Sequence, residues 1–144
     1  MFLHYSPLSP FVRKVMIAAL EIGVADRIEK VRSVTSMLRP NVELMKHNPW
    51  SKIPTLVLDD GLPLIDSDVI MEYLDSLHDG PKLHPQAPEW RWRSLRWRAL
   101  GSRLTRIAAI MARGSVSADA LVRDALGAVL MRGAVGWRRA VAGL

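Results

Sequence analysis

The chain has 144 residues, of which 49% are hydrophobic and 24% charged; it carries a net charge of +6 and contains no cysteine. This composition is that of a globular protein of one ordinary domain, or of one small domain and part of another. The lack of cysteine excludes disulfides, thiolate metal sites and redox chemistry of a protein thiol, and the lack of a membrane span or signal peptide predicts a cytoplasmic protein.

The first third of the chain alternates strand-like and helix-like patterns. Phe2–Tyr5 is a short β-compatible run, and Ser9 followed by Pro10 predicts the N-cap and first turn of a helix that Gly23 ends. Apolar residues recur at three- and four-residue steps along this helix, at Val12, Val15, Met16, Ala19 and Leu20. Residues 27–31 alternate apolar and polar side chains and are predicted to form a second strand.

A short helix and a hairpin are expected next. Residues 41–47 are a helical candidate because they follow a proline. Residues 55–58 and 62–65 are strand-like, and the Asp-Asp-Gly sequence at 59–61 between them is typical of a tight turn. These two strands are therefore predicted to pair as an antiparallel hairpin.

One more helix completes the first unit. Asp66 or Ser67 is its predicted cap, and its apolar face carries Val69, Ile70, Tyr73, Leu74 and Leu77. The order of elements is then β-α-β-α-β-β-α over residues 1–80. This order predicts a compact domain of the α/β class with a mixed sheet.

The second part of the chain differs in charge and in pattern. A proline-punctuated linker at residues 81–89 precedes it. Residues 1–80 hold 8 Lys and Arg against 11 Asp and Glu, whereas the remainder holds 12 against 3, so the basic character lies wholly beyond the first unit. Residues 90–144 are predicted to be a short all-helical region, with one long helix at 90–111 and a second helical stretch at 117–130.

Three motifs in the first part occur in one order and at compatible spacing. They are Tyr5-Ser6-Pro7-Leu8-Ser9-Pro10-Phe11-Val12-Arg13-Lys14-Val15, then Asn48-Pro49-Trp50-Ser51-Lys52-Ile53-Pro54, then Ile65-Asp66-Ser67. Together they resemble the bacterial glutathione S-transferases with a serine-type, zeta- or omega-like N-terminal domain. The resemblance covers roughly residues 1–85 and implies a thioredoxin-like fold for this α/β domain, with glutathione as its cosubstrate.

The resemblance implies that Ser9 is the catalytic residue. In this family a Ser, Tyr or Cys near the start of the first helix faces the glutathione sulfur. A serine hydroxyl there donates a hydrogen bond to the thiolate, and the helix N-terminus favours the anion, so both lower the pKa of the thiol. Ser6 and Tyr5 are the competing positions for this role, and the simpler interpretation is that Ser9 is only a helix N-cap.

The resemblance also assigns a role to Ile53 and Pro54. In the family the X-Pro bond before the third strand is cis, which turns the backbone of the preceding residue toward the cysteinyl backbone of glutathione. The alternative is a trans proline that merely opens a strand.

The remaining implied contacts hold the two ends of glutathione. Ser67 would take the γ-glutamyl carboxylate at a helix N-terminus, and Asp66, where Glu is commoner in the family, would help hold the amino group. An ordinary helix cap is the alternative for this pair. Lys52 would meet the glycyl carboxylate, whereas His47 is better interpreted as a solvent-exposed loop histidine.

Other ligand classes are not indicated. The four histidines show no metal-ligand spacing and no Gly-rich phosphate loop is present, so we expect neither a metal nor a nucleotide. The Trp- and Arg-rich run at 90–98 has the residue types that stack on single-stranded nucleic acid. On a helix, however, these tryptophans suit burial against the first unit and at a homodimer interface, as the resemblance implies, so nucleic-acid binding is not expected.

The resemblance implies attack of glutathione thiolate on a small electrophile, or a glutathione-assisted isomerisation. Residues 101–144 fit the family poorly, and either a shifted reading frame or a naturally shortened protein would explain this. The region that forms most of the electrophile pocket in the family would then be missing. Both a catalytic and a non-catalytic interpretation are therefore retained. The alternative is a non-catalytic module of the same fold that binds glutathione or another protein.

Overall fold

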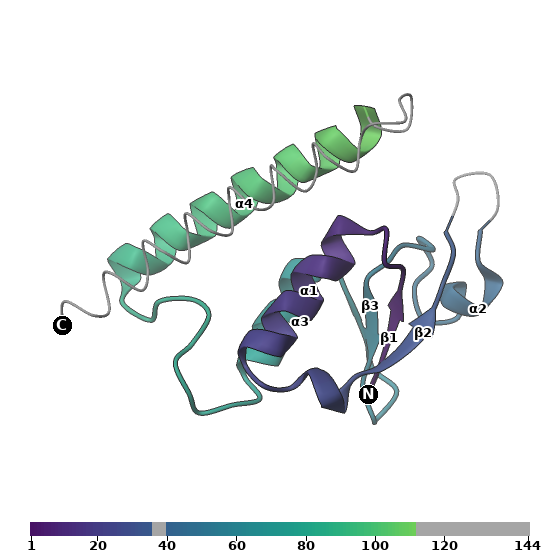
Figure 1. Cartoon of the computed structure of the whole chain (residues 1–144), viewed down its shortest axis with the longest axis horizontal. Coiled ribbons are helices and arrows are strands. Elements are labelled where there is room, and N and C mark those ends of the chain that lie inside the picture. The colour runs from purple at the N-terminus through teal and green to yellow at the C-terminus, as the bar shows by residue number, and fades with distance from the viewer. Residues whose placement is uncertain (36–39, 112–144) are drawn as a thin grey trace. The chain divides into compact units, whose positions relative to one another are not determined.

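A computed structural model describes residues 1–35 and 40–111 of the chain. The chain divides into two compact units, of which the first spans Met1–Leu83 and the second begins at His84 (Figure 1). The helical stretch predicted at 117–130 lies outside the described residues.

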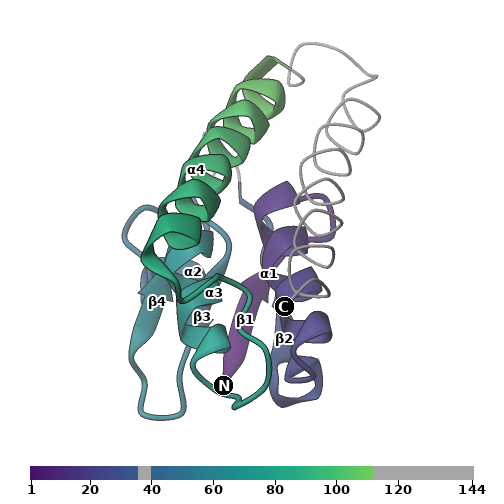
Figure 2. The same cartoon turned by 90° about the vertical axis from the view of Figure 1, so that its left-hand side faces the viewer.

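The first unit is built on one four-stranded sheet with strands β1 (Phe2–Tyr5), β2 (Glu29–Arg32), β3 (Thr55–Val57) and β4 (Pro63–Ile65). Their spatial order is β2-β1-β3-β4, which can be followed in Figure 2 from β2 on the right to β4 on the left. β1 is parallel to β2, whereas β3 is antiparallel to both β1 and β4. The predicted mixed sheet is thus confirmed: β3 and β4 are joined by a tight turn, whereas the parallel pair needs a helical crossover.

Helices lie on both faces of this sheet (Figure 1). α1 (Pro10–Glu21) and α3 (Ser67–Asp75) pack together on one face, and the short α2 (Val42–Met45) lies on the other. Because successive side chains of a strand point to opposite faces, each strand supplies side chains to both layers. The predicted element order of the α/β domain is confirmed, and it is the order of a thioredoxin-like fold.

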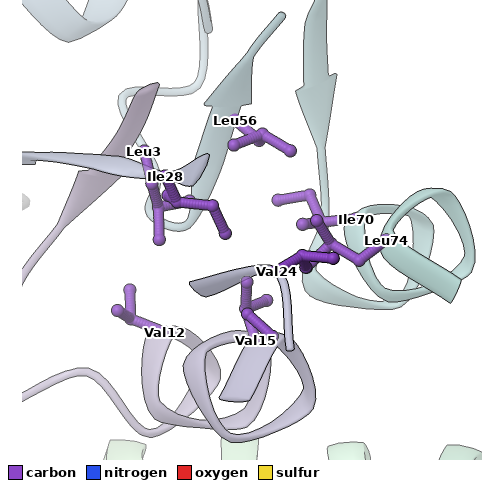
Figure 3. Close-up of a cluster of buried hydrophobic side chains, with 9 residues drawn as sticks. Leu3, Val12, Val15, Val24, Ile28, Leu56, Ile70 and Leu74 are labelled. Carbon is purple, nitrogen blue, oxygen red and sulfur yellow. The ribbon is translucent and has the colours of Figure 1, made fainter. Parts of the chain in front are cut away.

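The hydrophobic core lies between the sheet and the α1–α3 layer. Figure 3 shows the strand residues Leu3 and Leu56 pointing toward the side chains of the two helices. The helices and the turn after α1 contribute Val12, Val15, Ala19, Val24, Ile28, Ile70 and Leu74, all of them at most 4% exposed. Burial of these apolar side chains is the main favourable term that fixes α1 and α3 on the sheet, and so fixes where each helix begins.

Ile70 offers a small, defined test of this core. It is 0% exposed, and we expect Ile70→Val to lower the free energy of unfolding by about 1 kcal/mol, because one methyl group is removed from a packed site. Chemical denaturation followed by circular dichroism measures the change. The matched control is Ile17→Val on α1, which makes the same chemical change at a side chain that is 49% exposed. An equal loss in both variants would contradict the assigned core.

Two predicted elements differ from those observed. The second strand was predicted at residues 27–31 but spans Glu29–Arg32, because Ala25–Arg27 forms a 3₁₀ turn that closes the connection from α1. The helix predicted at 41–47 is limited to Val42–Met45, with Asn41 as its N-cap. At its end, backbone N–H groups bond to the carbonyl three residues earlier instead of four, as in the 3.0 Å bond from the His47 N–H to the Leu44 carbonyl. This tighter turn ends the α-helix early.

The second unit begins with the linker and a single long helix, α4 (Pro88–Met111), close to the predicted bounds. Inside this unit, His84 is 6% exposed and lies 3.0 Å from the Ser94 hydroxyl and 2.9 Å from the Arg98 guanidinium. These contacts attach the linker to the first half of the helix.

Burial of the α4 tryptophans against the first unit and at a homodimer interface stays a prediction. Trp90, Trp92 and Trp97 are 48%, 70% and 63% exposed. Arg93 and Arg96 lie over the rings of Trp90 and Trp97, at 5.0 and 5.9 Å from the ring centroids. These cation–π contacts pair two of the indoles with arginines of the same helix. The expectation of no nucleic-acid binding stays a prediction.

Candidate glutathione-binding edge

The strand register brings the three sequence motifs to one edge of the sheet. His4 of β1 pairs with Thr55 of β3, and Thr55 pairs with Ile65 of β4. The residues that follow β1, precede β3 and follow β4 therefore all lie at the same end of these strands. We call this end the binding edge; it comprises Ser6–Ser9, Lys52–Pro54 and Asp66–Ser67.

Two helices begin at the binding edge, and each has a side-chain cap. Ser9 is the N-cap of α1, where its Oγ accepts a hydrogen bond from the Val12 N–H at 3.3 Å. Asp66 is the N-cap of α3, where its Oδ1 accepts from the Asp68 N–H at 2.9 Å. Both predicted caps are confirmed. Two helix N-termini at one edge supply unpaired N–H groups and partial positive charge, the arrangement that binds anions.

The Ser9 hydroxyl keeps its proton for a further partner. In the contact with Val12 its oxygen acts as the acceptor, so the O–H remains available as a donor. Ser6, the competing residue, accepts a longer bond of 3.4 Å from the Leu8 N–H and caps no helix. Both serines are half-buried. The geometry therefore distinguishes Ser9 by its place at the start of α1.

The Ile53–Pro54 peptide bond is cis, as the resemblance implied. Pro54 is buried at the start of β3 and Ile53 is half-buried. Lys52, one residue earlier, has an exposed side chain at the same edge. The backbone of Ile53 and the amine of Lys52 thus belong to a single loop.

A buried asparagine that sequence reasoning missed organises this loop. Asn48 is 0% exposed, and its side-chain amide donates to the Lys52 carbonyl at 3.0 Å and to the Thr55 hydroxyl at 2.9 Å. Its Oδ1 accepts from the Trp50 N–H at 3.0 Å. One side chain therefore bonds to residues spread along the whole loop before β3. The only sequence signal was the Asn-Pro dipeptide that opens the second motif.

Ser67 is the most distinctive side chain at the binding edge. It is 4% exposed, yet its hydroxyl makes no hydrogen bond to any residue in the ranges 1–35 and 40–111. No fully buried side-chain polar atom in the described part of the chain lacks a partner, so this hydroxyl reaches solvent at the binding edge, where a ligand can contact it. The residue before it, Asp66, has a backbone φ of 76°, a conformation that costs a non-glycine residue about 1–3 kcal/mol and that clusters at ligand sites.

The first turns of α1 and α3 are joined by an ion pair that the sequence did not reveal. The Lys14 ammonium donates to the Asp68 carboxylate, and their side chains are 10% and 31% exposed. Residues 54 positions apart are thereby linked. The pair holds the two helix N-termini side by side, which positions Ser9 and Ser67 relative to one another.

His47 is not the solvent-exposed loop histidine that the sequence suggested. It is half-buried, and its Nδ1 lies 3.1 Å from Nε2 of His4. His4 is 3% exposed, and the pKa of its imidazole is lowered first by burial and second by the charge of His47. The structure therefore brings together two histidines, on β1 and after α2, that no sequence pattern pairs.

Two further findings concern the described part of the chain alone. Within residues 1–35 and 40–111, no three His, Asp or Glu side chains are grouped so as to hold a metal ion. Over the same ranges, no helix is both long and apolar enough to cross a bilayer. The expectation of no metal stays a prediction.

Comparison with known proteins identifies the family of this chain. Residues 8–77 match the N-terminal domain of glutathione S-transferases. A glutathione transferase family member from Pseudomonas fluorescens Pf-5, solved with bound glutathione, is 34% identical with a TM-score of 0.74; the alignment covers 90% of this chain and 68% of that protein.

Two curated relatives match over the first unit. A stringent starvation protein A homolog from Coxiella burnetii is 39% identical over 93 residues, which are 65% of this chain and 42% of the relative. A probable glutathione S-transferase from Nicotiana tabacum is 35% identical over 81 residues, or 56% of this chain and 34% of the relative. The chain thus spans well under half the length of these curated relatives.

Proposed function

Since the chain belongs to the glutathione transferase family, we propose that its binding edge binds glutathione and directs the thiolate toward a small electrophile. The observation that carries the proposal is the strand register, which brings Ser9, Ile53 and Ser67 to one end of the sheet beside two helix N-termini. The bound glutathione named for the Pseudomonas fluorescens relative supports the choice of ligand.

The sulfur end of glutathione is assigned to α1. The Ser9 O–H donates to the thiolate, and the N-terminus of α1 adds partial positive charge. Both interactions favour the charged form of the thiol, so they lower its pKa and raise the thiolate fraction at neutral pH. In conjugation the sulfur forms a bond to the electrophilic carbon while the leaving group departs with the bonding electron pair; in a glutathione-assisted isomerisation the thiolate is released again.

The opposite end of glutathione is assigned to α3. The γ-glutamyl carboxylate accepts from the Ser67 hydroxyl and from the N–H groups at the start of α3, while the Asp66 carboxylate bonds the amino group. Oδ1 of Asp66 caps α3, so its second carboxylate oxygen is the one assigned to the amino group. The Ser67 hydroxyl, which reaches solvent at the binding edge and bonds to no other described residue, supports this assignment.

The middle and the glycyl end are assigned to the loop before β3. The Ile53 backbone bonds the cysteinyl backbone of glutathione, and the exposed Lys52 ammonium meets the glycyl carboxylate. We further expect a cytoplasmic homodimer that uses neither a metal nor a nucleotide and does not bind nucleic acid.

A second candidate is a module of the same fold that binds glutathione or another protein without turnover. It is favoured by the 39% identity to a relative named for stringent starvation rather than for transfer.

One pair of assays separates the two candidates. The full chain is tested for retention on immobilised glutathione and for conjugation of glutathione to a general aromatic electrophile. Retention together with turnover supports the transferase, whereas retention without turnover supports the binding module. Failure of both would contradict the proposed function.

A further inference from the structure

A hydrogen-bonded histidine pair lies on the face of the sheet opposite α1 and α3. His4 Nε2 is 3.1 Å from His47 Nδ1, and His4 Nδ1 is 2.8 Å from the Ser33 hydroxyl. His4 and Ser33 are 3% and 2% exposed. The cluster therefore joins β1, the residue after β2 and the residues after α2 through hydrogen bonds.

An aromatic ring covers this pair. The Phe2 ring stands edge-on to both imidazoles, with its centroid 5.5 Å from each. The two imidazoles are themselves 5.2 Å apart between centroids. An apolar cover limits access of water, so a charge on the pair is poorly solvated and is disfavoured.

The bonding partners indicate one arrangement of the protons on the two rings. The Ser33 hydroxyl donates to the Val31 carbonyl at 3.3 Å, so it accepts from the Nδ1–H of His4. Neutral His4 then has its lone pair on Nε2, which accepts from the Nδ1–H of His47. Whichever ring donates, this hydrogen bond requires that one of the two facing nitrogens carry no proton.

The pair tolerates one added proton but not two. A proton on Nε2 of His47 leaves its Nδ1–H bond to His4 intact and makes it charge-assisted. A second proton must go to Nε2 of His4. Two N–H groups then face each other across the 3.1 Å contact, between two like charges, and the bond is lost.

The histidine pair is directly continuous with the loop of the binding edge. Asn48, which follows His47 in the chain, bonds to the Lys52 carbonyl and to the Thr55 hydroxyl. Movement of His47 away from β1 therefore displaces Asn48, and with it the backbone that presents Ile53.

We propose that His4 and His47 are a positioning pair that holds the loop before β3 in its ligand-binding conformation and releases it when both rings are protonated. The ligand part rests on the proposed function, whereas the release of the loop does not. Among the described residues, Phe2 and Ser33 face the pair from β1 and β2 and carry no charge. From α2 the facing groups are Glu43 and Lys46, which are paired with each other at 2.6 Å.

The direction of the pH dependence follows from His4. Burial, and second the charge of His47, lower its pKa in the folded chain from the ordinary value of 6.5. In the unfolded chain His4 takes its proton below that ordinary value. The stabilisation that neutral His4 provides is therefore complete above 6.5 and is lost as the pH falls from 6.5 through the lowered pKa.

Calorimetric titration of the full chain with glutathione at about pH 7 and about pH 5 tests the proposal. Wild type is expected to lose affinity at the lower pH, by up to about tenfold for each pH unit over which one linked proton is taken up. His47→Gln is expected to lose less than about twofold, because the amide bonds His4 in either protonation state and carries no charge. The matched control is His78→Gln, a histidine bonded to Asp75 at 3.1 Å and absent from the binding edge, which should behave as wild type.

An equal loss of affinity in wild type and His47→Gln would overturn the positioning pair, because titration of glutathione itself is common to both. Hydrogen exchange gives a second readout that needs no ligand. Protection of the backbone amides of residues 44–48 is expected to fall in wild type at the lower pH and to stay unchanged in His47→Gln. If no glutathione binds at either pH, the proposed function fails while this exchange still decides the positioning pair: unchanged protection in wild type would overturn it.

Discussion

Ser67→Ala is expected to weaken glutathione binding about 10- to 100-fold. A hydrogen bond to a charged group contributes about 1.5–3 kcal/mol, and tenfold in affinity corresponds to about 1.4 kcal/mol. Ser67 is 4% exposed and opens α3, so the carboxylate that it bonds would be held away from bulk water at a helix N-terminus. Isothermal titration calorimetry of the full chain measures the change.

The fold should be unaffected by this substitution. The Ser67 hydroxyl bonds to nothing else in the described ranges, and alanine favours helix, so the free energy of unfolding should change by less than about 0.5 kcal/mol. The matched control is Ser76→Ala at the other end of α3, whose hydroxyl bonds the Tyr73 carbonyl at 2.6 Å. Equal affinities of wild type and Ser67→Ala would remove Ser67 from the site.

Ser9→Ala is expected to lower kcat/KM for conjugation about 100-fold. This is the usual effect of removing one hydrogen-bond donor to a catalytic anion, here the glutathione thiolate. The pKa of bound glutathione should rise back toward the ordinary thiol value of about 8.5. The ultraviolet absorbance of the thiolate, followed against pH in the complex, measures this pKa even if the chain only binds glutathione. The variant also loses its helix cap, at a cost of about 1 kcal/mol in stability.

Ser9→Gly separates the two roles of Ser9. Glycine at an N-cap costs only a few tenths of a kcal/mol, so this variant loses the hydroxyl and keeps most of the stability of α1. It should show the same rise in thiol pKa as Ser9→Ala. Ser6→Ala is the control, since Ser6 caps no helix. A raised thiol pKa in Ser6→Ala, with none in Ser9→Gly, would transfer the role to Ser6.

Most of the first unit could be predicted because its signals are local. The Ser9-Pro10 pair predicts where α1 starts, because the N-cap and the N–H group that it bonds lie within four consecutive residues. The Asp-Gly turn at 60–61 likewise predicts how the two hairpin strands pair. The bounds of β2 and α2 could not be predicted as well. Each depends on where the chain packs against the sheet, and a single turn of helix carries too few residues for periodicity to show.

The polar supports of the site could not be predicted, because they join residues far apart in sequence. Lys14 and Asp68 meet only because α1 and α3 pack on one face of the sheet. His4 and His47 meet only because the alternation of β1 turns His4 toward α2, while Leu3 points into the core (Figure 3). No spacing in the sequence indicates these pairs, whereas the ligand-facing residues lie in compact motifs.

The central claim is that glutathione binds at the edge where the starts of α1, β3 and α3 meet. Amide NMR spectra of the isotope-labelled full chain, recorded while glutathione is added, test it most directly. The amide signals of Ile53, of Ser67 and of the first turn of α1 are expected to shift and saturate together, while those of the hairpin tip at residues 59–61 stay in place. Saturable shifts confined to other residues, or no shifts at all, would contradict the claim.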